Sequence, residues 1–298
     1  MIVLTLVHGR ERQLTNLIRG LELSPTPPTA LVVVQMNEAP RALHSARFPI
    51  QVLGVTGDGI LPLAAARNAA VAAAPGEELV FLDVDCIPAP ALLDGYRQAL
   101  AARPEALHQG FVHYLPAGVA EGEWTPDELL ATGVVHPLHR DRPPGAEVPH
   151  PLFWSLNFAC RRATFQRIGG FDEGYRGYGG EDTDFAFRAQ EAGVSVFQAD
   201  ARAFHQYHPT YHPPLNHFAS ILANARRFQA RWGLWPMDGW LRDFAAAGYI
   251  HFDESRGIEE LRAPNAAEIA ACRDASGSGF GGLGATNPAN ATLKVGLV

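Results

Sequence analysis

The chain has 298 residues, enough for one large α/β domain or for one domain with an appendage. Hydrophobic residues make up 47% and charged residues 18%, which excludes disordered, collagen-like and coiled-coil chains. The formal charge is −7 and Lys294 is the only lysine, so a nucleic-acid-binding surface is not expected.

Membrane insertion and a disulfide framework are not expected either. No apolar run approaches the length of a membrane span, and the first residues lack the basic start of a secretion signal. Cys86, Cys160 and Cys272 are odd in number and widely separated, which favours neither disulfides nor a cysteine zinc site. A cytoplasmic protein is therefore expected.

The first part of the chain alternates apolar strands with helical segments. Strands are expected at 2–7, 31–36, 50–54 and 78–85, with a helix after the first strand and an alanine-rich helix at 62–74. This alternation predicts an α/β fold, a doubly wound and mostly parallel sheet flanked by helices. Residues 1–112 are interpreted as a nucleotide-binding half, with ligands at the carboxyl ends of the strands.

The second part is less regular. Residues 115–150 lose all periodicity and are expected to form a long irregular loop near a site. A strand is expected at 153–162, and 218–247 is typical of two amphipathic helices broken at Trp235-Pro236. We divide this part into 113–215, a helical extension over 216–275 and a flexible tail over 276–298.

Asp83 and Asp85 directly follow the strongest strand. Alternation in an extended chain would place both carboxylates on one side. Mg²⁺ and Mn²⁺ prefer carboxylate ligands and can bridge to diphosphate oxygens, so this position indicates a metal site. The alternative is a pair of turn-forming aspartates before Pro88.

The segment Gly179-Gly180-Glu181-Asp182-x-Asp184 places three carboxylates in the first turn of a helix. Helix capping alone would explain the acids, because the macrodipole favours negative charge there. Capping does not require the glycines, which let a backbone approach a bulky ligand, and Tyr175 or Tyr178 could stack on a sugar ring. A carboxylate at a rigid helix end is also well placed to accept a proton from a hydroxyl.

Histidines and arginines supply further candidates. His205 follows a strand and could return to the Asp-x-Asp segment as a third metal ligand, with His208 as the alternate, although solvated histidines are common in such proline-rich stretches. The Arg67-Asn68 pair on an apolar helix suggests a buried polar role rather than a surface one. Arg10 follows the first strand and could reach a phosphate, or could be a solvated residue at a helix start.

These motifs occur in an order that resembles a known family. The residues that carry the likeness are Arg10-Glu11-x-x-Leu14, Ala66-Arg67-Asn68, Phe81-Leu82-Asp83-Val84-Asp85, Gly169-Gly170-Phe171-Asp172 and Gly179-Gly180-Glu181-Asp182-x-Asp184. Together they resemble a family 2 type nucleotide-sugar glycosyltransferase of the GT-A fold. The second half also resembles the galactosyltransferase carboxy-terminal segment and polypeptide N-acetylgalactosaminyltransferase-like enzymes.

The resemblance implies a metal-dependent hexosyltransferase. It implies a nucleotide-sugar half over 1–112 and an acceptor-binding and catalytic half over 113–215, with Asp182 as base and Glu181 beside it. The metal, Mn²⁺ or Mg²⁺, would be held by Asp83, Asp85 and His205. The donor, a UDP-sugar or a GDP-sugar, would be bound by Arg10, Asn37, Asp58, Arg67, Asn68, Asp83 and Asp85, and the acceptor by Tyr178, Gly179, Gly180 and Glu181.

The reaction expected from the resemblance is transfer of a sugar to an acceptor hydroxyl with inversion. The acceptor would be a carbohydrate, glycoside or glycolipid, and a lipid acceptor would bring the protein to a membrane surface without an integral segment. Tyr178 stands where a tryptophan usually precedes the two glycines, so the resemblance does not imply an acceptor preference. The alternatives are a sugar-1-phosphate nucleotidyltransferase, which the His8-Gly9-Arg10 loop fits poorly, and a non-enzymatic metal- or carbohydrate-binding module.

Overall fold

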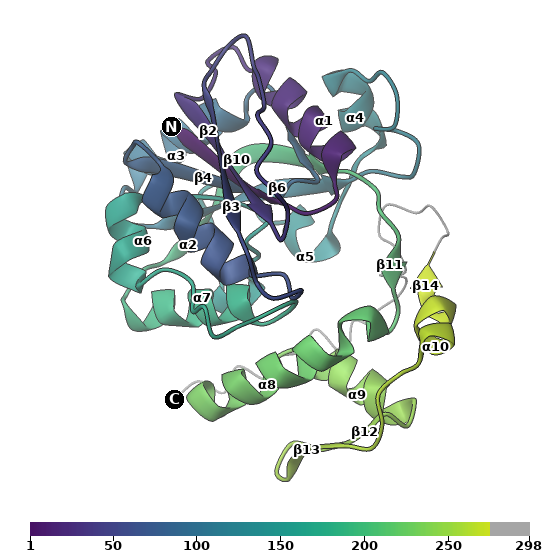
Figure 1. Ribbon diagram of the computed structural model, residues 1–298. Coiled ribbons are helices and arrows are strands. Elements are labelled where there is room, and N and C mark those ends of the chain that lie inside the picture. The colour runs from purple at the N-terminus through teal and green to yellow at the C-terminus, as the bar shows by residue number, and fades with distance from the viewer. Residues whose placement is uncertain (275–298) are drawn as a thin grey trace.

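The structure is a computed structural model that describes residues 1–274, so the expected tail at 276–298 lies outside the described residues. A ten-stranded sheet carries helices on both faces, and a smaller helical extension follows it (Figure 1). The architecture is the α/β fold expected from the sequence.

The main path of the sheet has the order β3-β2-β1-β4-β9-β6-β10-β5. The strands are β1 (Ile2–Val7), β2 (Ala30–Met36), β3 (Ile50–Val55), β4 (Glu78–Leu82), β5 (Cys86–Pro88), β6 (Leu107–Tyr114), β9 (Asn157–Arg161) and β10 (Val196–His205). Strands β3, β2, β1 and β4 are parallel, as are β6 and β10. Strands β9 and β5 run antiparallel to their neighbours, so the second half of the sheet is mixed.

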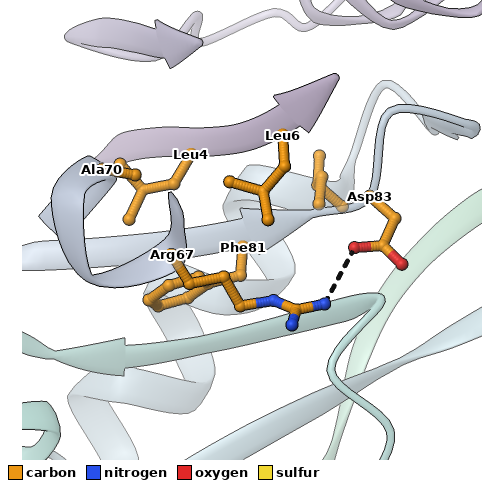
Figure 2. Close-up of a pocket in the computed structure, with 7 residues that line it drawn as sticks. Leu4, Leu6, Arg67, Ala70, Phe81 and Asp83 are labelled. Atoms are coloured by element: carbon orange, nitrogen blue, oxygen red, sulfur yellow. Dashed lines mark ion pairs between the residues drawn. The ribbon is translucent and has the colours of Figure 1, made fainter. Parts of the chain in front are cut away.

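Two apolar layers enclose the sheet because side chains alternate along each strand. Ile2, Leu4 and Leu6 of β1 pack with one helical layer, and Val3 and Val7 pack with the other. The first layer consists of α2 (Leu63–Ala73), α6 (Arg162–Ile168) and α7 (Glu181–Glu191), and the second of α1 (Glu11–Glu22) and α3 (Leu92–Ala102). Figure 2 shows Leu4 and Leu6 of β1 beside Ala70 of α2.

The segment 115–150 contains short regular elements, so the expectation of an irregular loop is wrong. They are α4 (Pro126–Thr132), β7 (Val134–Val135), α5 (Pro137–Arg140) and β8 (Glu147–Val148), followed by a 3-10 turn at His150–Leu152. Helix α4 begins at a capping box formed by Thr125 and Glu128. Strands β7 and β8 add to β6 and β10, and elements this short give no periodic signal in a sequence.

Two expected strands have different bounds. Strand β9 begins only at Asn157, so 153–156 is not part of it. Strand β4 ends at Leu82 rather than at Asp85, because the backbone turns there and the Cys86 N–H donates to the Asp83 carbonyl.

The helical extension has its own apolar core. It contains η2 (Leu215–His217), α8 (Phe218–Trp232), α9 (Asp238–Ala246), β12 (Ile250–Asp253), β13 (Gly257–Glu260) and α10 (Ala266–Ala271), and the short pair β11 (Thr210–Tyr211) and β14 (Arg273–Asp274) connects its two ends. Helix α8 ends at Gly233, whose left-handed backbone stops the helix before Trp235-Pro236. The expected pair of helices broken at this point is confirmed.

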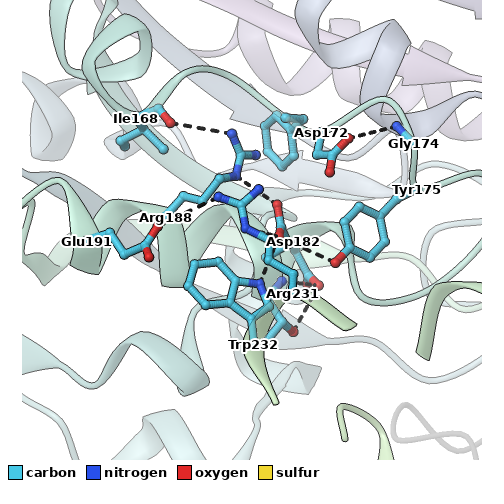
Figure 3. Close-up of polar contacts among 12 residues, drawn as sticks. Ile168, Asp172, Gly174, Tyr175, Asp182, Arg188, Glu191, Arg231 and Trp232 are labelled. Carbon is cyan, nitrogen blue, oxygen red and sulfur yellow. Dashed lines mark hydrogen bonds and ion pairs between the residues drawn. The ribbon is translucent and has the colours of Figure 1, made fainter. Parts of the chain in front are cut away.

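A buried carboxylate joins the extension to the sheet domain. Asp184 of α7 is fully buried and accepts hydrogen bonds from Trp232 Nε1 at 2.9 Å, from Arg188 Nε at 2.8 Å and from the Tyr175 hydroxyl at 3.4 Å. Arg231 lies 3.8 Å away as a further ion-pair partner (Figure 3). Because Trp232 and Arg231 belong to the end of α8, this network fixes the extension against the helix that begins at Glu181.

Two further expectations concern the whole described region. Among residues 1–274 no helix is both long enough and apolar enough to cross a membrane. Cys86, Cys160 and Cys272 are free thiols.

Replacing Trp232 by Phe should destabilise the protein. The substitution keeps the ring but removes the indole donor from a buried carboxylate, which costs about 1–3 kcal/mol in the free energy of unfolding. Trp235→Phe is the matched control, because Trp235 Nε1 donates instead to the exposed backbone carbonyl of Glu254, where water can replace it. Urea unfolding measures both, and equal losses would contradict a special role for the Asp184 network.

Candidate functional site

Three of the expected site residues, Arg10, Asp83 and Asp85, lie just after the carboxyl ends of β1 and β4. Asp83 and Asp85 lie in the turn after β4, and they do not share one side of an extended chain. The turn sends the two side chains to different partners, Asp83 toward Arg67 and Asp85 toward Arg10. The expectation of paired carboxylates on one face is therefore corrected.

Asp85 is the centre of a cluster of basic side chains. It is 5% exposed and forms an ion pair with Arg10, which follows β1. His205 Nε2 lies 3.5 Å from Asp85 Oδ1, and His208 Nε2 lies 3.5 Å from Asp85 Oδ2. The sheet explains the first contact, because antiparallel pairing of β5 with β10 places His205 opposite Cys86, the residue after Asp85.

Asp85, His205 and His208 form a group that fits a divalent metal ion, and these three residues are called the metal group. One ligand atom from each lies within 4.8 Å of the others. Asp85 Oδ1 is buried without a hydrogen-bond partner among the described residues, as expected of an oxygen that binds a cation. Two imidazoles and one carboxylate suit Mn²⁺ better than Mg²⁺, which prefers oxygen ligands alone.

This group differs from the expected ligand set. His208, the alternate candidate, joins it, whereas Asp83 lies outside it. The difference follows from the turn at 83–85, which directs the Asp83 side chain to Arg67.

The charges of the cluster are strongly coupled. Burial opposes ionisation of Asp85, yet His205, Arg10 and His208 together hold the pKa of its carboxyl below its usual range. Burial lowers the pKa of His205 to about 4, against the opposing attraction of Asp85. The neutral imidazole of His205 beside an ionised carboxylate is the protonation state in which a metal is bound.

Arg67 of α2 connects this turn to the acidic helix end. The side chain is 5% exposed, which confirms the buried polar role expected for it. Its guanidinium donates to Glu181 Oε1 at 3.1 Å. It also lies 3.5 Å from Asp83 Oδ1, the ion pair drawn in Figure 2. Burial opposes its charge, but Asp83 and Glu181 raise the pKa of Arg67, so the arginine stays charged between two carboxylates.

Asp182 stands next to this pair in the first turn of α7. Its Oδ1 accepts the Thr183 N–H at 2.8 Å. Burial and the neighbouring Glu181 carboxylate raise the pKa of Asp182 to about 7, while Arg67 opposes the shift. A carboxyl group with this pKa exchanges protons near neutrality, as a general base must.

The two glycines before α7 are required by the extension. Gly179 and Gly180 have φ values of +97° and +87°, in the left-handed region. A Cβ on Gly179 would lie 2.6 Å from the sulfur of Met237 in the loop before α9. The glycines were expected to let the backbone approach a bulky ligand. At Gly179 the group that approaches closely is the Met237 side chain of this protein.

Tyr178 is the exposed aromatic ring of this region. It is 42% exposed and stacks on His217 with ring centroids 4.5 Å apart, and Trp240 lies 5.8 Å away. Tyr175 is buried and its hydroxyl donates to Asp184. The expectation that Tyr175 could stack on a sugar is therefore wrong, and only Tyr178 of the two tyrosines has an exposed ring.

The remaining donor candidates hold loops in place. The Asn68 amide donates to the Phe171 carbonyl and its oxygen accepts the Phe171 N–H, which fixes the turn before α7. Asn37 Oδ1 accepts the Gly57 N–H at 2.7 Å. The Asp58 side chain is 95% exposed and lies 3.6 Å from Arg176. None of these three residues belongs to the metal group.

Sequence reasoning missed two sets of residues. His217 and Trp240 come from the extension, and only the folded chain brings them beside Tyr178. Gln109, His139 and Trp154 converge from β6, α5 and the segment before β9, and no motif connects them.

Known proteins resemble this fold and parts of this sequence. A family model described as the N-terminal domain of galactosyltransferase matches residues 136–213. Crystal structures of GalNAc-T7 with UDP, GalNAc and Mn²⁺ and of S. aureus TarS 1-349 with UDP both superpose with a TM-score of 0.51. The match to GalNAc-T7 has 15% sequence identity and covers 69% of this chain and 43% of the GalNAc-T7 chain. The match to TarS has 16% sequence identity and covers 76% of this chain and 65% of the TarS chain.

The chain has a GT-A fold and resembles glycosyltransferases. A validoxylamine A glucosyltransferase of Streptomyces hygroscopicus subsp. jinggangensis (strain 5008) is 28% identical in a 158-residue alignment that covers 45% of this chain. The matched segment spans 36% of that relative's length. The resemblance to a GT-A glycosyltransferase with a galactosyltransferase-like second half is confirmed.

Replacing Asp85 by Asn should weaken Mn²⁺ binding by more than about tenfold. The amide keeps the size of the side chain but removes the negative charge between the two histidines. Asp94→Asn is the matched control, because Asp94 pairs with Arg97 on α3 and lies outside the metal group. Isothermal titration of Mn²⁺ measures both variants, and an unchanged affinity of Asp85→Asn would show that this group is not the metal site.

Proposed function

We propose that this protein is a metal-dependent glycosyltransferase that moves a sugar from a nucleoside diphosphate sugar, with UDP favoured over GDP, to an acceptor hydroxyl with inversion. The observation that carries the proposal is the buried bridge of Arg67 between Asp83 and Glu181. This bridge links the turn that carries Asp85, one residue of the candidate metal group, to the helix turn that carries Asp182, whose carboxyl has a pKa near neutrality, and it supports the proposal for that reason. Transfer of a sugar to a hydroxyl uses positive charge beside the departing diphosphate and a base for the hydroxyl proton.

The donor side is argued from charge. Asp85, His205 and His208 would hold Mn²⁺, which would stabilise the negative charge that develops on the departing diphosphate. Arg10 is 36% exposed on its side chain and forms an ion pair with Asp85, so it borders the same space and can contact a phosphate oxygen. The metal ion and Arg10 would together counter the negative charge of the donor's diphosphate.

The acceptor side is argued from the first turn of α7. Asp182 would accept the proton of the acceptor hydroxyl as that oxygen attacks the anomeric carbon. Glu181 is held by Arg67, so it acts on the charge of Asp182 rather than as a second base. Attack from the side opposite the diphosphate inverts the anomeric carbon.

The acceptor itself would lie on the aromatic surface of Tyr178, His217 and Trp240. Exposed aromatic rings bind the apolar faces of sugars, and these rings adjoin the glycines that precede Asp182. A carbohydrate or glycoside acceptor fits this surface. The name of the relative, a validoxylamine A glucosyltransferase, supports a small glycoside-like acceptor.

Thermal unfolding with UDP, GDP and their sugars, each with and without Mn²⁺, tests this function. A ligand at about a hundred times its dissociation constant stabilises the folded state by about 2.7 kcal/mol. We expect stabilisation by UDP and UDP-sugars only when Mn²⁺ is present, and NMR of the product should show an inverted anomeric carbon. Stabilisation by Zn²⁺ alone, with no response to any nucleotide, would instead indicate a metal-binding module.

Replacing Asp182 by Asn should lower turnover by about 10²–10⁴-fold while leaving UDP binding intact, because only the proton acceptor is removed. Wild-type turnover should rise with pH through about 7 as Asp182 ionises. Kinetics across pH and a UDP titration measure these effects. Normal turnover of Asp182→Asn would rule out Asp182 as the base.

The same variant gives a second readout in the absence of substrate. The pKa of Asp182 is raised in the folded state, so its contribution to stability is present at low pH and is lost as pH rises toward 7. The amide of Asp182→Asn carries no charge at any pH and does not suffer this loss. The variant should therefore have a larger free energy of unfolding than wild type at pH 8, and the difference between the two proteins should be smaller at pH 5. Asp94→Asn is the matched control, because it also replaces a carboxylate by an amide but lies on α3, where Asp94 pairs with Arg97.

A further inference from the structure

A small cavity lies beside the metal group on the β6 side of the sheet. It has a volume of about 10 Å³ and is lined by residues that include Gln109, Tyr114, His136, His139 and Trp154. Tyr114 connects it to the metal group, because its ring centroid lies 4.9 Å from that of His205. Tyr114, His136 and Trp154 are partly exposed, so the cavity borders the molecular surface.

The protonation of His139 is fixed by its neighbours. Gln109 Oε1 accepts the backbone N–H of Trp154 at 2.9 Å, which fixes the orientation of the Gln109 amide. The amide nitrogen therefore faces His139 Nδ1 at 3.1 Å and donates a hydrogen bond to it. Nδ1 is therefore the acceptor, and in a neutral imidazole the proton must sit on Nε2. Burial lowers the pKa of His139 to about 4, which keeps the ring neutral at physiological pH.

His139 Nε2–H is a donor without a partner among the described residues. The side chain is 5% exposed, and Trp154 packs against it edge to face at 4.5 Å. A buried donor left unpaired is costly, so native proteins rarely keep one without a reason. A cavity of this volume has room for one oxygen atom and no more.

These observations define the ligand group. A neutral N–H donor binds an oxygen acceptor, such as a sugar hydroxyl, and repels an ammonium group at the same point. The rest of a sugar ring would remain outside the cavity, against the partly exposed rings of Trp154 and Tyr114.

We propose that His139, positioned by Gln109, is a specificity-determining residue that binds one hydroxyl oxygen of a sugar held next to the metal group. This inference rests on the proposed function, since the sugar is either that of the donor or that of the acceptor. The two sources share one chemistry, and the experiment separates them.

The test uses two variants of the full chain. His139→Asn keeps a polar group at the Nδ1 position, where Gln109 donates, but removes Nε2. His139→Gln is the matched control, because its amide reaches the Nε2 position. Each protein with Mn²⁺ is titrated calorimetrically with UDP, with UDP-glucose and its four monodeoxy analogues, and then, with UDP bound, with methyl glucoside and its monodeoxy analogues.

We expect one deoxy analogue, in one of the two series, to bind wild type about three- to tenfold more weakly than its parent. His139→Asn should lose that difference, His139→Gln should keep most of it, and all three proteins should bind UDP equally. The series in which the effect occurs identifies the sugar as donor or acceptor.

Two results would overturn the inference in different ways. If UDP and UDP-glucose bind but no deoxy analogue distinguishes wild type from His139→Asn, the subsite is wrong and the proposed function stands. If wild type binds neither UDP nor UDP-glucose with Mn²⁺, the proposed function fails first. Nitrogen NMR of labelled histidine gives an independent readout, because the Nε2 signal of His139 should move when the discriminating sugar is added.

Discussion

The site depends on the burial of one guanidinium. Arg67 projects from an alanine-rich helix into the space between the turn after β4 and the start of α7, where Asp83 and Glu181 contact it. Burying an uncompensated charge costs several kcal/mol, so the arginine must keep its two carboxylates. It thereby fixes the distance between the segment that faces the metal group and the segment that carries Asp182.

Much of the fold was predictable from the sequence, for identifiable reasons. The strands at 2–7, 31–36 and 50–54 and the helices around Trp235-Pro236 have long apolar patterns and clear breaks, and these are local signals. The small elements within 115–150 have neither. Their positions are set by pairing with β6 and β10, which a local pattern does not contain.

The candidate site shows the same division. Asp85, His205 and Arg67 were recognisable because a strong element positions each: Asp85 follows β4, His205 ends β10 and Arg67 lies within the apolar helix α2. The exclusion of Asp83 from the metal group depends on a turn of three residues, and the inclusion of His208 depends on how the chain leaves β10. The pairing of Tyr178 with His217 depends on the docking of a separate core, and no spacing in the sequence encodes it.

The network around Asp184 limits how the extension can be exchanged. The last turn of α8 supplies two of the partners of a fully buried carboxylate on α7. The extension therefore contributes side chains to the interior of the domain that contains the ten-stranded sheet. A chimera that grafts a different extension onto this sheet must bring equivalents of Arg231 and Trp232 with it. The aromatic surface that the extension builds around Tyr178 is therefore exchangeable only together with this anchor, so a change of that surface is also a change in the stability of the protein.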